Sequence, residues 1–389
     1  MQFDFDTPIV RKNTWCTKWD MPTDFGRDDV IPMWIADMDF ASPEPVREAL
    51  MARAAQGAYG YIHPPKACAQ AQVDWQRARN GWAVEPDWIL DSPGVVGSIR
   101  IAINALTAPG DGIIINPPVY GPFFSSVREA GRTLVEVPLR ATDGFYEMDF
   151  AGIEAAMAAG AKAMILCSPH NPVGRVWTAE ELARLGALCR RYGVLLISDE
   201  IHSDLILPGH AHIPAPKGYG EGWEKTVTLT STTKTFNLAG LQLSSAIIPD
   251  PELRAAFRHQ RDASGVMQNN LMAEAARYAA YTQGAPWLDA LRVYLDDNCA
   301  AAIDFMARRM RKARCRHPEA TYLLWVDLRG YGMEGEDAEA FFGRKAGVFI
   351  GKGKDYGQEG DGFIRINVAC PRSQVMAALE RMAQALEDR

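Results

Sequence analysis

Short apolar runs alternate with longer amphipathic stretches through the middle of the chain, from about residue 110 to about residue 200. The apolar runs are rich in β-branched residues, as buried strands are, and the stretches between them have helical spacing. KAMILC and VLLIS are apolar throughout, as expected of strands covered on both faces. The segments come in the order GIIIN, GPFFSSVREAG, TLVEV, KAMILC, a helix after Thr178, and VLLIS. This alternation predicts βαβ units and a mostly parallel sheet.

The helix after Thr178 has the clearest start in the sequence. Thr178 followed by Glu181 is the pattern of a capping box, in which each side chain bonds the backbone N–H of the other residue. An apolar series at helical spacing follows, made of Leu182, Leu185 and Leu188. We therefore predict that this helix begins directly after Thr178.

The pattern changes after about residue 284. A long helix-like stretch runs from Trp287 to about Arg314, and the strand TYLLWVDL, a short helix, the strand FIRIN and a helix after Pro371 follow it. The first forty residues show no such rhythm, and we expect them to form an arm that packs across a domain or subunit boundary. The prediction is a large α/β domain over 46–284, with residues 1–45 and 285–389 forming the arm and a smaller α+β domain.

Composition and charge narrow the function classes. The 389 residues are 48% hydrophobic and 23% charged, which is typical of a soluble globular protein. A formal net charge of -7 argues against nucleic acid or an anionic membrane as a partner. We find no apolar run of spanning length and no signal-peptide pattern at the start, so a cytoplasmic location is expected.

Cysteine and histidine spacing gives no sign of a metal site. The seven cysteines are scattered and never form CxxC, so neither a zinc site nor a disulfide framework is expected. His202, His210 and His212 lack the spacing of standard metal ligands, and loop histidines are the favoured interpretation. GKGKDYG has the wrong spacing for a dinucleotide-binding loop and precedes a strand.

Lys234 has an unusual sequence environment. It follows the strand-like TVTLT, and no carboxylate occurs between Glu224 and Asp250. A solvated loop lysine is the common alternative. In an enclosed, nearly uncharged setting, however, desolvation should lower the pKa of this amine toward the range in which it is a nucleophile. Schiff-base chemistry requires such an amine.

Other polar groups follow predicted strands at positions that should face the same crevice. SPGVVGS offers backbone N–H groups at a helix start, and Asn171 offers an amide, although a glycine turn and an Asn-Pro turn explain these two equally well. Tyr120 offers a ring that could stack on a planar ligand, although a lone tyrosine more often serves in packing. Asp199 is stronger evidence, because a carboxylate directly after an apolar strand needs a cationic partner. Parallel strands direct such groups to one edge of the sheet. Together with Lys234 they indicate a pyridoxal phosphate site.

Motifs along nearly the whole chain resemble one family. SPHNPVGRVWTAEEL, SDEIHSDL and STTKTFNLAGLQ are similar to the motifs of fold-type I pyridoxal-phosphate enzymes of the class I/II aminotransferase superfamily. The resemblance is closer to its MalY/PatB-type branch of cystathionine, or cysteine-S-conjugate, β-lyases, through NTWCTKWD, IPMWIADMDF, YGYIHP, SPGVVGS, PPVYGPF and FIRINVACPR. The fold it implies is aspartate-aminotransferase-like, with a large mostly parallel-sheet domain and a smaller α+β domain.

The resemblance implies a role for each position that matches a motif. Lys234 would hold the cofactor and move the Cα proton, and Asp199 would pair with the pyridine nitrogen. Arg365 would bind the substrate carboxylate, for which guanidinium geometry is suited. The other implied contacts are Asn171 to the phenolic oxygen, Tyr120 stacked on the ring, backbone at Val95 and Val96 with the Ser231 hydroxyl on the phosphate, and Tyr61 on the phosphate of the neighbouring subunit of a homodimer.

Departures from the family's patterns separate its branches. Gln242 stands where many aminotransferases have a phosphate-binding arginine, and His202, near the cofactor, where they have a tyrosine; both resemble the lyase branch. Asn13, Cys16 and Tyr356 differ from the usual Gly, Ser and Phe of that branch, and these differences concern the substrate pocket rather than the cofactor.

The resemblance implies α,β-elimination from cystathionine, cysteine or a related cysteine S-conjugate, which gives a thiol, pyruvate and ammonia. One alternative is an aminotransferase, which uses the same residues but transfers the amino group. Another is a non-catalytic regulatory protein on the same fold. The presence of Lys234, Asp199, Asn171 and Arg365 argues against the second alternative.

Overall fold

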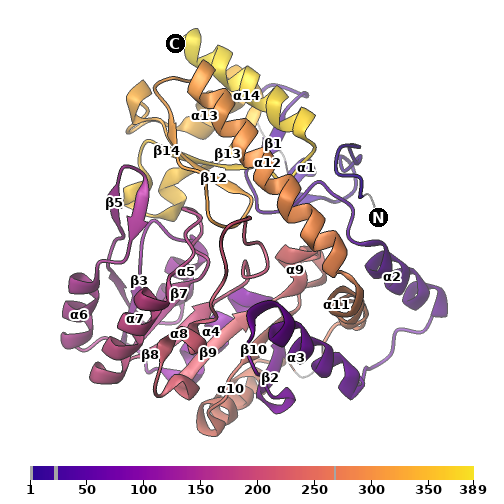
Figure 1. The fold of residues 1–389 in the computed structure, drawn as a ribbon, viewed down its shortest axis with the longest axis vertical. Helices are drawn as coiled ribbons and strands as arrows, with labels where there is room; N and C mark the ends of the chain where they lie inside the picture. The colour runs from indigo at the N-terminus through magenta and orange to yellow at the C-terminus, as the bar shows by residue number, and fades with distance from the viewer. Residues whose placement is uncertain (1–2, 22–24, 267–268) are drawn as a thin grey trace.

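The strands divide between a large and a small sheet, each with its own helices, and a separate two-stranded hairpin (Figure 1). The computed structural model describes residues 3–21, 25–266 and 269–389. The predicted arm residues 1–2 and 22–24 lie outside these ranges. The strands are β1 (Ile31–Met33), β2 (Ile89–Ser92), β3 (Gly112–Ile115), β4 (Thr133–Glu136), β5 (Arg140–Thr142), β6 (Phe145–Glu147), β7 (Ala163–Cys167), β8 (Leu195–Asp199), β9 (Thr226–Thr230), β10 (Ser244–Ile247), β11 (Arg314–Cys315), β12 (Leu323–Asp327), β13 (Val348–Lys352) and β14 (Phe363–Asn367). The α-helices are α1 (Thr17–Asp20), α2 (Glu44–Gln56), α3 (Lys66–Asn80), α4 (Val95–Leu106), α5 (Pro122–Glu129), α6 (Phe150–Ala158), α7 (Ala179–Tyr192), α8 (Ala215–Tyr219), α9 (Thr232–Thr235), α10 (Pro251–Ala263), α11 (Leu271–Gln283), α12 (Ala285–Arg309), α13 (Ala338–Ala346) and α14 (Arg372–Glu387).

The large sheet has the strand order β2-β10-β9-β8-β7-β3-β4. The strands from β9 to β4 run parallel, and β10 is antiparallel to both of its neighbours. All seven strands fall within the range predicted for the large domain, although the boundaries at 46 and 284 stay a prediction. The sequence therefore predicted a mostly parallel sheet correctly.

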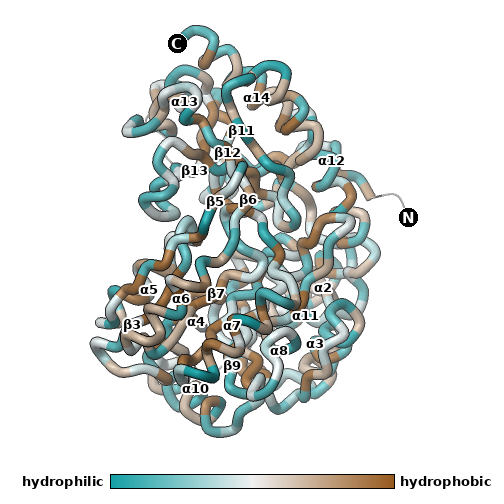
Figure 2. The backbone as a smooth tube through the Cα atoms, turned by 60° about the vertical axis from the view of Figure 1, so that its left-hand side comes forward, coloured by the Kyte–Doolittle hydropathy of each residue, from teal (hydrophilic) through white to brown (hydrophobic). Residues whose placement is uncertain are grey.

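Helices cover both faces of the large sheet. One apolar core lies between the sheet and the side of α4, α5 and α10, and a second lies on the side of α6, α7 and α8. Figure 2 shows hydrophobic stretches along β7 and β9 in the interior. KAMILC and VLLIS are buried because helices pack on both sides of them, which explains why their sequences lack a polar face. The capping box is present, since Thr178 Oγ1 accepts from Glu181 N and Glu181 Oε2 accepts from Thr178 N.

The small sheet has the strand order β1-β13-β14-β12-β11 and packs against α12, α13 and α14, at the top of Figure 1. The N-terminal segment contributes a strand to this sheet, since Ile31–Met33 pairs in parallel with β13. The packing of this segment as an arm across a domain or subunit boundary stays a prediction. One sequence prediction was wrong here. The long helix ends at Arg309 rather than near Arg314, because Arg314–Cys315 forms the edge strand β11 against β12.

No helix in the ranges that the structure describes is both long enough and apolar enough to cross a membrane.

Candidate active site

The carboxyl ends of the central strands of the large sheet open into one cavity. Four predicted residues at or after the ends of β3, β7, β8 and β9 line it, namely Tyr120, Asn171, Asp199 and Lys234, and Arg365 reaches it from the small sheet. This is where an open parallel sheet places its ligands. The lining residues are Ile35, Ala36, Val95, Val96, Tyr120, Cys167, Asn171, Asp199, Ile201, His202, Lys234 and Arg365.

Lys234 lies on the short helix α9, directly after the buried strand β9. Its Nζ donates to the backbone carbonyl of Ala36 at 2.5 Å, and no ion pair in the described ranges includes it. Burial, together with the charge of the nearby Arg365, lowers the pKa of Lys234 to about 8, although Asp37 and Asp199 oppose the shift. The amine is therefore closer to its neutral, nucleophilic form than an ordinary lysine.

Asp199 ends β8 and is 3% exposed. Its Oδ1 accepts from the backbone N–H of Ile201 at 3.1 Å. Burial raises the pKa of Asp199 to about 7, and the charge of Glu200 adds to the shift. The cation that the sequence led us to expect is not a side chain of the described part of the chain, since no ion pair there involves Asp199.

Arg365 lies on β14 and is 5% exposed. Its Nη1 donates to Asn171 Oδ1 at 3.1 Å, and its Nη2 donates to the Trp34 carbonyl at 2.7 Å. Because the Asn171 oxygen accepts from Arg365, the amide N–H groups of Asn171 remain available as donors. The guanidinium and the amide therefore form one connected polar edge of the cavity.

Tyr120 follows β3, and its ring packs edge-on against Phe123 at a centroid distance of 5.9 Å. Burial raises the pKa of the Tyr120 hydroxyl above its ordinary value, and the Asp199 charge adds to this effect. The hydroxyl is therefore protonated at neutral pH.

The first turn of α4 forms a second polar edge. Gly94 precedes the helix with a φ of 79°, a conformation that glycine adopts without strain. The N–H groups of Val95 and Val96 come before the first intrahelical bond, so they can bind an anion at the positive end of the helix. Ser231 does not line the cavity, and its Oγ donates to the Leu243 carbonyl at 2.6 Å.

His202 is 3% exposed and packs edge-on against Tyr322 at 6.1 Å. Burial, with the charges of Lys234 and Arg365, lowers the pKa of His202 to about 3, so the imidazole is neutral. Its Nδ1 is buried and has no hydrogen-bond partner among the described residues. An unpartnered buried nitrogen beside a cavity is available to a ligand.

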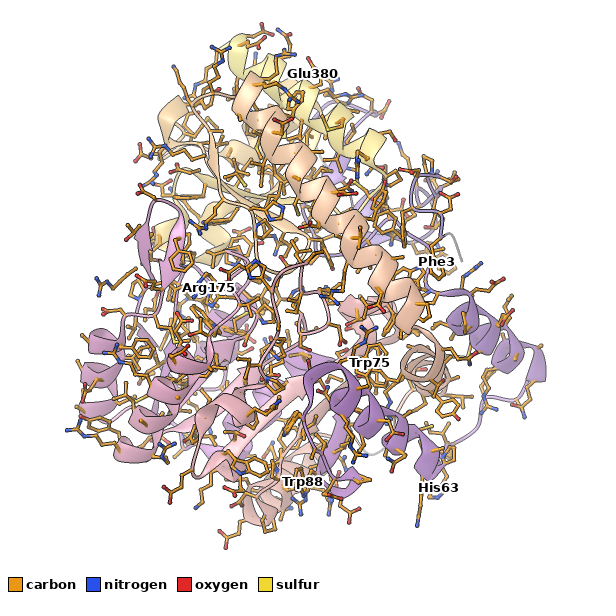
Figure 3. The ribbon with its side chains drawn as sticks, viewed as in Figure 1. Phe3, His63, Trp75, Trp88, Arg175 and Glu380 are labelled. Carbon is orange, nitrogen blue, oxygen red and sulfur yellow. The ribbon has the colours of Figure 1, made fainter. Side chains whose placement is uncertain are left out.

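Tyr61 lies away from the cavity of its own chain and is 98% exposed. It lines a separate surface hollow together with His63 and Tyr278. Figure 3 labels His63 at the lower right, where the segment between α2 and α3 forms the periphery of the molecule.

Sequence reasoning assigned no role to four of the lining residues. Ile35 and Ala36 lie in IPMWIADMDF, Ile201 lies in SDEIHSDL, and Cys167 is the last residue of KAMILC. The motifs marked these segments, but Ala36 contributes a backbone carbonyl, which its side chain does not reveal.

The donor set fits the cofactor that the resemblance implies. Pyridoxal phosphate needs an amine for its aldehyde, an acid for its ring nitrogen and N–H groups for its phosphate. Lys234, Asp199 and the first turn of α4 supply these groups in one cavity, which His202 also lines. The residues present therefore fit the group.

Three comparisons give the relatives of this chain. The family model described as aminotransferase class I and II matches residues 28–382. Cystathionine beta-lyase PatB of Bacillus subtilis is 40% identical over 98% of this chain and 100% of its own length, and protein MalY of Escherichia coli is 35% identical over 99% of each. The crystal structure of the PLP-bound C-S lyase from Staphylococcus hominis superposes with a TM-score of 0.94, at 34% identity over 99% of this chain and 98% of that one.

Proposed function

The chain belongs to the aminotransferase class I and II family, and from this premise we propose that it is a pyridoxal-phosphate-dependent carbon-sulfur β-lyase. It cleaves L-cystathionine, L-cysteine or a related cysteine S-conjugate by α,β-elimination. The observation that carries this conclusion is the full-length similarity to a cystathionine beta-lyase and a C-S lyase in a chain whose cavity contains Lys234, Asp199 and Arg365.

Seven of the lining residues have a task in this reaction. Asp199 would pair with the ring nitrogen of the cofactor, and Asn171 would donate to the phenolic oxygen. Val95 and Val96 would bind the phosphate through their backbone N–H groups. Tyr120 would pack on the ring. When bound, pyridoxal phosphate supplies an electron sink for the pair that remains at Cα when its proton leaves.

Lys234 takes the proton from Cα, because its lowered pKa leaves a basic amine near neutral pH. Arg365 binds the substrate carboxylate and thereby fixes which bond at Cα faces the amine. The bond between Cβ and sulfur then breaks, and the sulfur leaves with the electron pair as a thiolate. The remaining 2-aminoacrylate hydrolyses to pyruvate and ammonia.

The protein acts as a homodimer with shared active sites in this proposal. Tyr61 is almost fully exposed and cannot serve the cavity of its own chain, yet it lies in a hollow lined by further aromatic residues. Large exposed apolar groups gathered in a hollow are typical of an interface. A second copy that covers this hollow would bring Tyr61 to the phosphate of the neighbouring site. The proposed location is the cytoplasm.

The experiment that separates this function from transamination is the supply of a keto acid. The purified protein is incubated with L-cystathionine with and without 2-oxoglutarate, and pyruvate and glutamate are both measured. A lyase releases pyruvate at the same rate in both reactions and forms no glutamate. An aminotransferase forms glutamate in proportion to the amino acid consumed and is inactive without the keto acid.

A further inference from the structure

Tyr356 lies next to the candidate active site but does not line the cavity. It ends the 3-10 helix Gly353–Tyr356, between β13 and β14, and is 6% exposed. Its contacts show what an aromatic ring does there.

The ring of Tyr356 covers the guanidinium of Arg365. Arg365 Cζ lies 4.9 Å from the ring centroid, a distance at which a cation is attracted to an aromatic face. The attraction is stronger away from water, and both side chains are buried. Arg365 Nε is buried without a hydrogen-bond partner in the described ranges, so two hydrogen bonds and this ring hold the guanidinium.

The ring of Tyr356 is itself packed against Trp325. Trp325 packs edge-on against it at 5.4 Å, and Trp325 Nε1 donates to the Tyr146 hydroxyl at 3.0 Å. Because Tyr146 belongs to β6 and Arg365 to β14, the row from Tyr146 through Trp325 and Tyr356 to Arg365 connects the hairpin to the small sheet.

The backbone of Tyr356 contacts the loop that carries Tyr120. Its carbonyl accepts from Val119 N at 2.8 Å. At Gly121 a Cβ would meet the Asp355 carbonyl at 2.7 Å, so the two loops approach as closely as glycine allows. One residue therefore touches both the arginine that binds the substrate and the loop of the stacking tyrosine.

We propose that Tyr356 is a positioning residue, whose ring fixes the plane of the Arg365 guanidinium for bidentate binding of the substrate carboxylate. Two parallel hydrogen bonds to a carboxylate require a fixed plane. The ring is sufficient for this role, so Phe in its place serves equally well and the hydroxyl does not select the substrate. The inference rests on the role proposed above for Arg365.

The test measures binding rather than turnover. Calorimetry measures the Kd of the cofactor-loaded protein for 3-(methylthio)propanoate. This probe has a carboxylate and a thioether but no amine to react, so its Kd reports binding of the carboxylate without reaction at the cofactor. The neutral 3-(methylthio)propanamide is the matched probe without the charge. In Tyr356→Leu, Kd for the carboxylate rises about tenfold, as expected for loss of a desolvated cation-π contact. Kd for the amide and Kd for either probe in Tyr356→Phe stay within about twofold.

Phe363→Leu is the control variant. Phe363 stacks on the same Trp325 at 5.1 Å, but its ring faces Arg329 rather than Arg365. Its loss leaves the preference for the carboxylate over the amide unchanged. Tyr356→Met replaces the leucine variant if leucine prevents folding.

Equal weakening of both probes in Tyr356→Leu, or unchanged carboxylate binding, overturns the proposal. A wild-type protein with no preference for the carboxylate overturns it together with the role of Arg365. Because neither probe can be cleaved, a protein that fails to eliminate thiol from cystathionine still gives a clear result here, so the failure of the proposed reaction is distinguishable.

Discussion

Asp199 and Lys234 show how burial changes the chemistry of single residues. The same loss of water raises the pKa of the acid to about 7 and lowers the pKa of the amine to about 8. Both groups are ordinarily charged at neutral pH, but in this cavity their pKa values lie close to each other and close to neutral pH. In the proposed reaction, Asp199 would pair with the ring nitrogen of the cofactor and Lys234 would move a proton.

Replacement of Asp199 by Asn is expected to stabilise the cofactor-free protein in a pH-dependent way. The folded-state pKa lies above the ordinary value of 3.8, so the wild type loses stability as pH rises from about 4 to about 7, and Asn has no such loss. The free energy of unfolding in urea should exceed that of the wild type at pH 8 by on the order of a few kcal/mol. The excess should be smaller at pH 5.

The exposed Asp87→Asn, measured in the same way, is the control and should change little at either pH. If Asp199→Asn raises the free energy of unfolding equally at pH 5 and pH 8, burial does not raise the pKa of Asp199 in the folded protein.

The sequence could place charged residues in the cavity when they stand in an apolar segment. It could not place residues that contribute only a backbone group. Lys234 and Asp199 stand out because each follows a buried strand. Ala36 holds Lys234 through a carbonyl oxygen, which every residue has, so its contribution appears only in the fold.

At the scale of elements, α7 depends on a glycine in its middle. Gly186 packs against the backbone of α8, where a Cβ would collide with the Tyr219 carbonyl. Alanine is the better helix former by about 1 kcal/mol, yet Gly186→Ala should destabilise the protein by ~2 kcal/mol or more because backbone cannot move aside easily. Urea unfolding measures the difference.

Ala187→Gly, on the exposed side of the same helix, is the matched control. It should cost about 1 kcal/mol through helix propensity alone. If Gly186→Ala proves as stable as the wild type, α7 does not pack on α8 as closely as the structure indicates.

Element prediction succeeded where local sequence decides and failed where pairing decides. The start of α7 follows from Thr178 and Glu181, which bond each other's backbone. The strands β1 and β11 are three and two residues long, and they exist because β13 and β12 offer them a free edge. Such a strand has no signal of its own.

At the scale of the whole molecule, the proposed shared site makes a prediction about mixed subunits. Tyr61→Ala and Lys234→Ala should each lose most activity as pure proteins. A mixed dimer has one site in which Lys234 of one chain meets Tyr61 of the other, both intact. Denaturing the two variants together and refolding them should therefore restore activity, measured as pyruvate release.

The control refolds each variant alone, which should restore none. If the mixture stays as inactive as its components while light scattering shows dimers, Tyr61 does not act across the interface.

The arrangement of the whole cavity was predictable in part. Four residues after parallel strands share an edge by topology, so their meeting could be inferred from sequence. Arg365 and Asn171 are 194 positions apart in the sequence and come from different sheets, since Arg365 lies on β14 and Asn171 follows β7. No local sequence pattern indicates their hydrogen bond. Only the resemblance placed Arg365 at the site.

The most direct test of carbon-sulfur β-elimination is the ratio of thiol to pyruvate released from L-cystathionine with no keto acid present. Equal amounts are expected from the wild type, and neither product is expected from a folded Lys234→Ala protein. Release that requires a keto acid, or full release by Lys234→Ala, would contradict this mechanism.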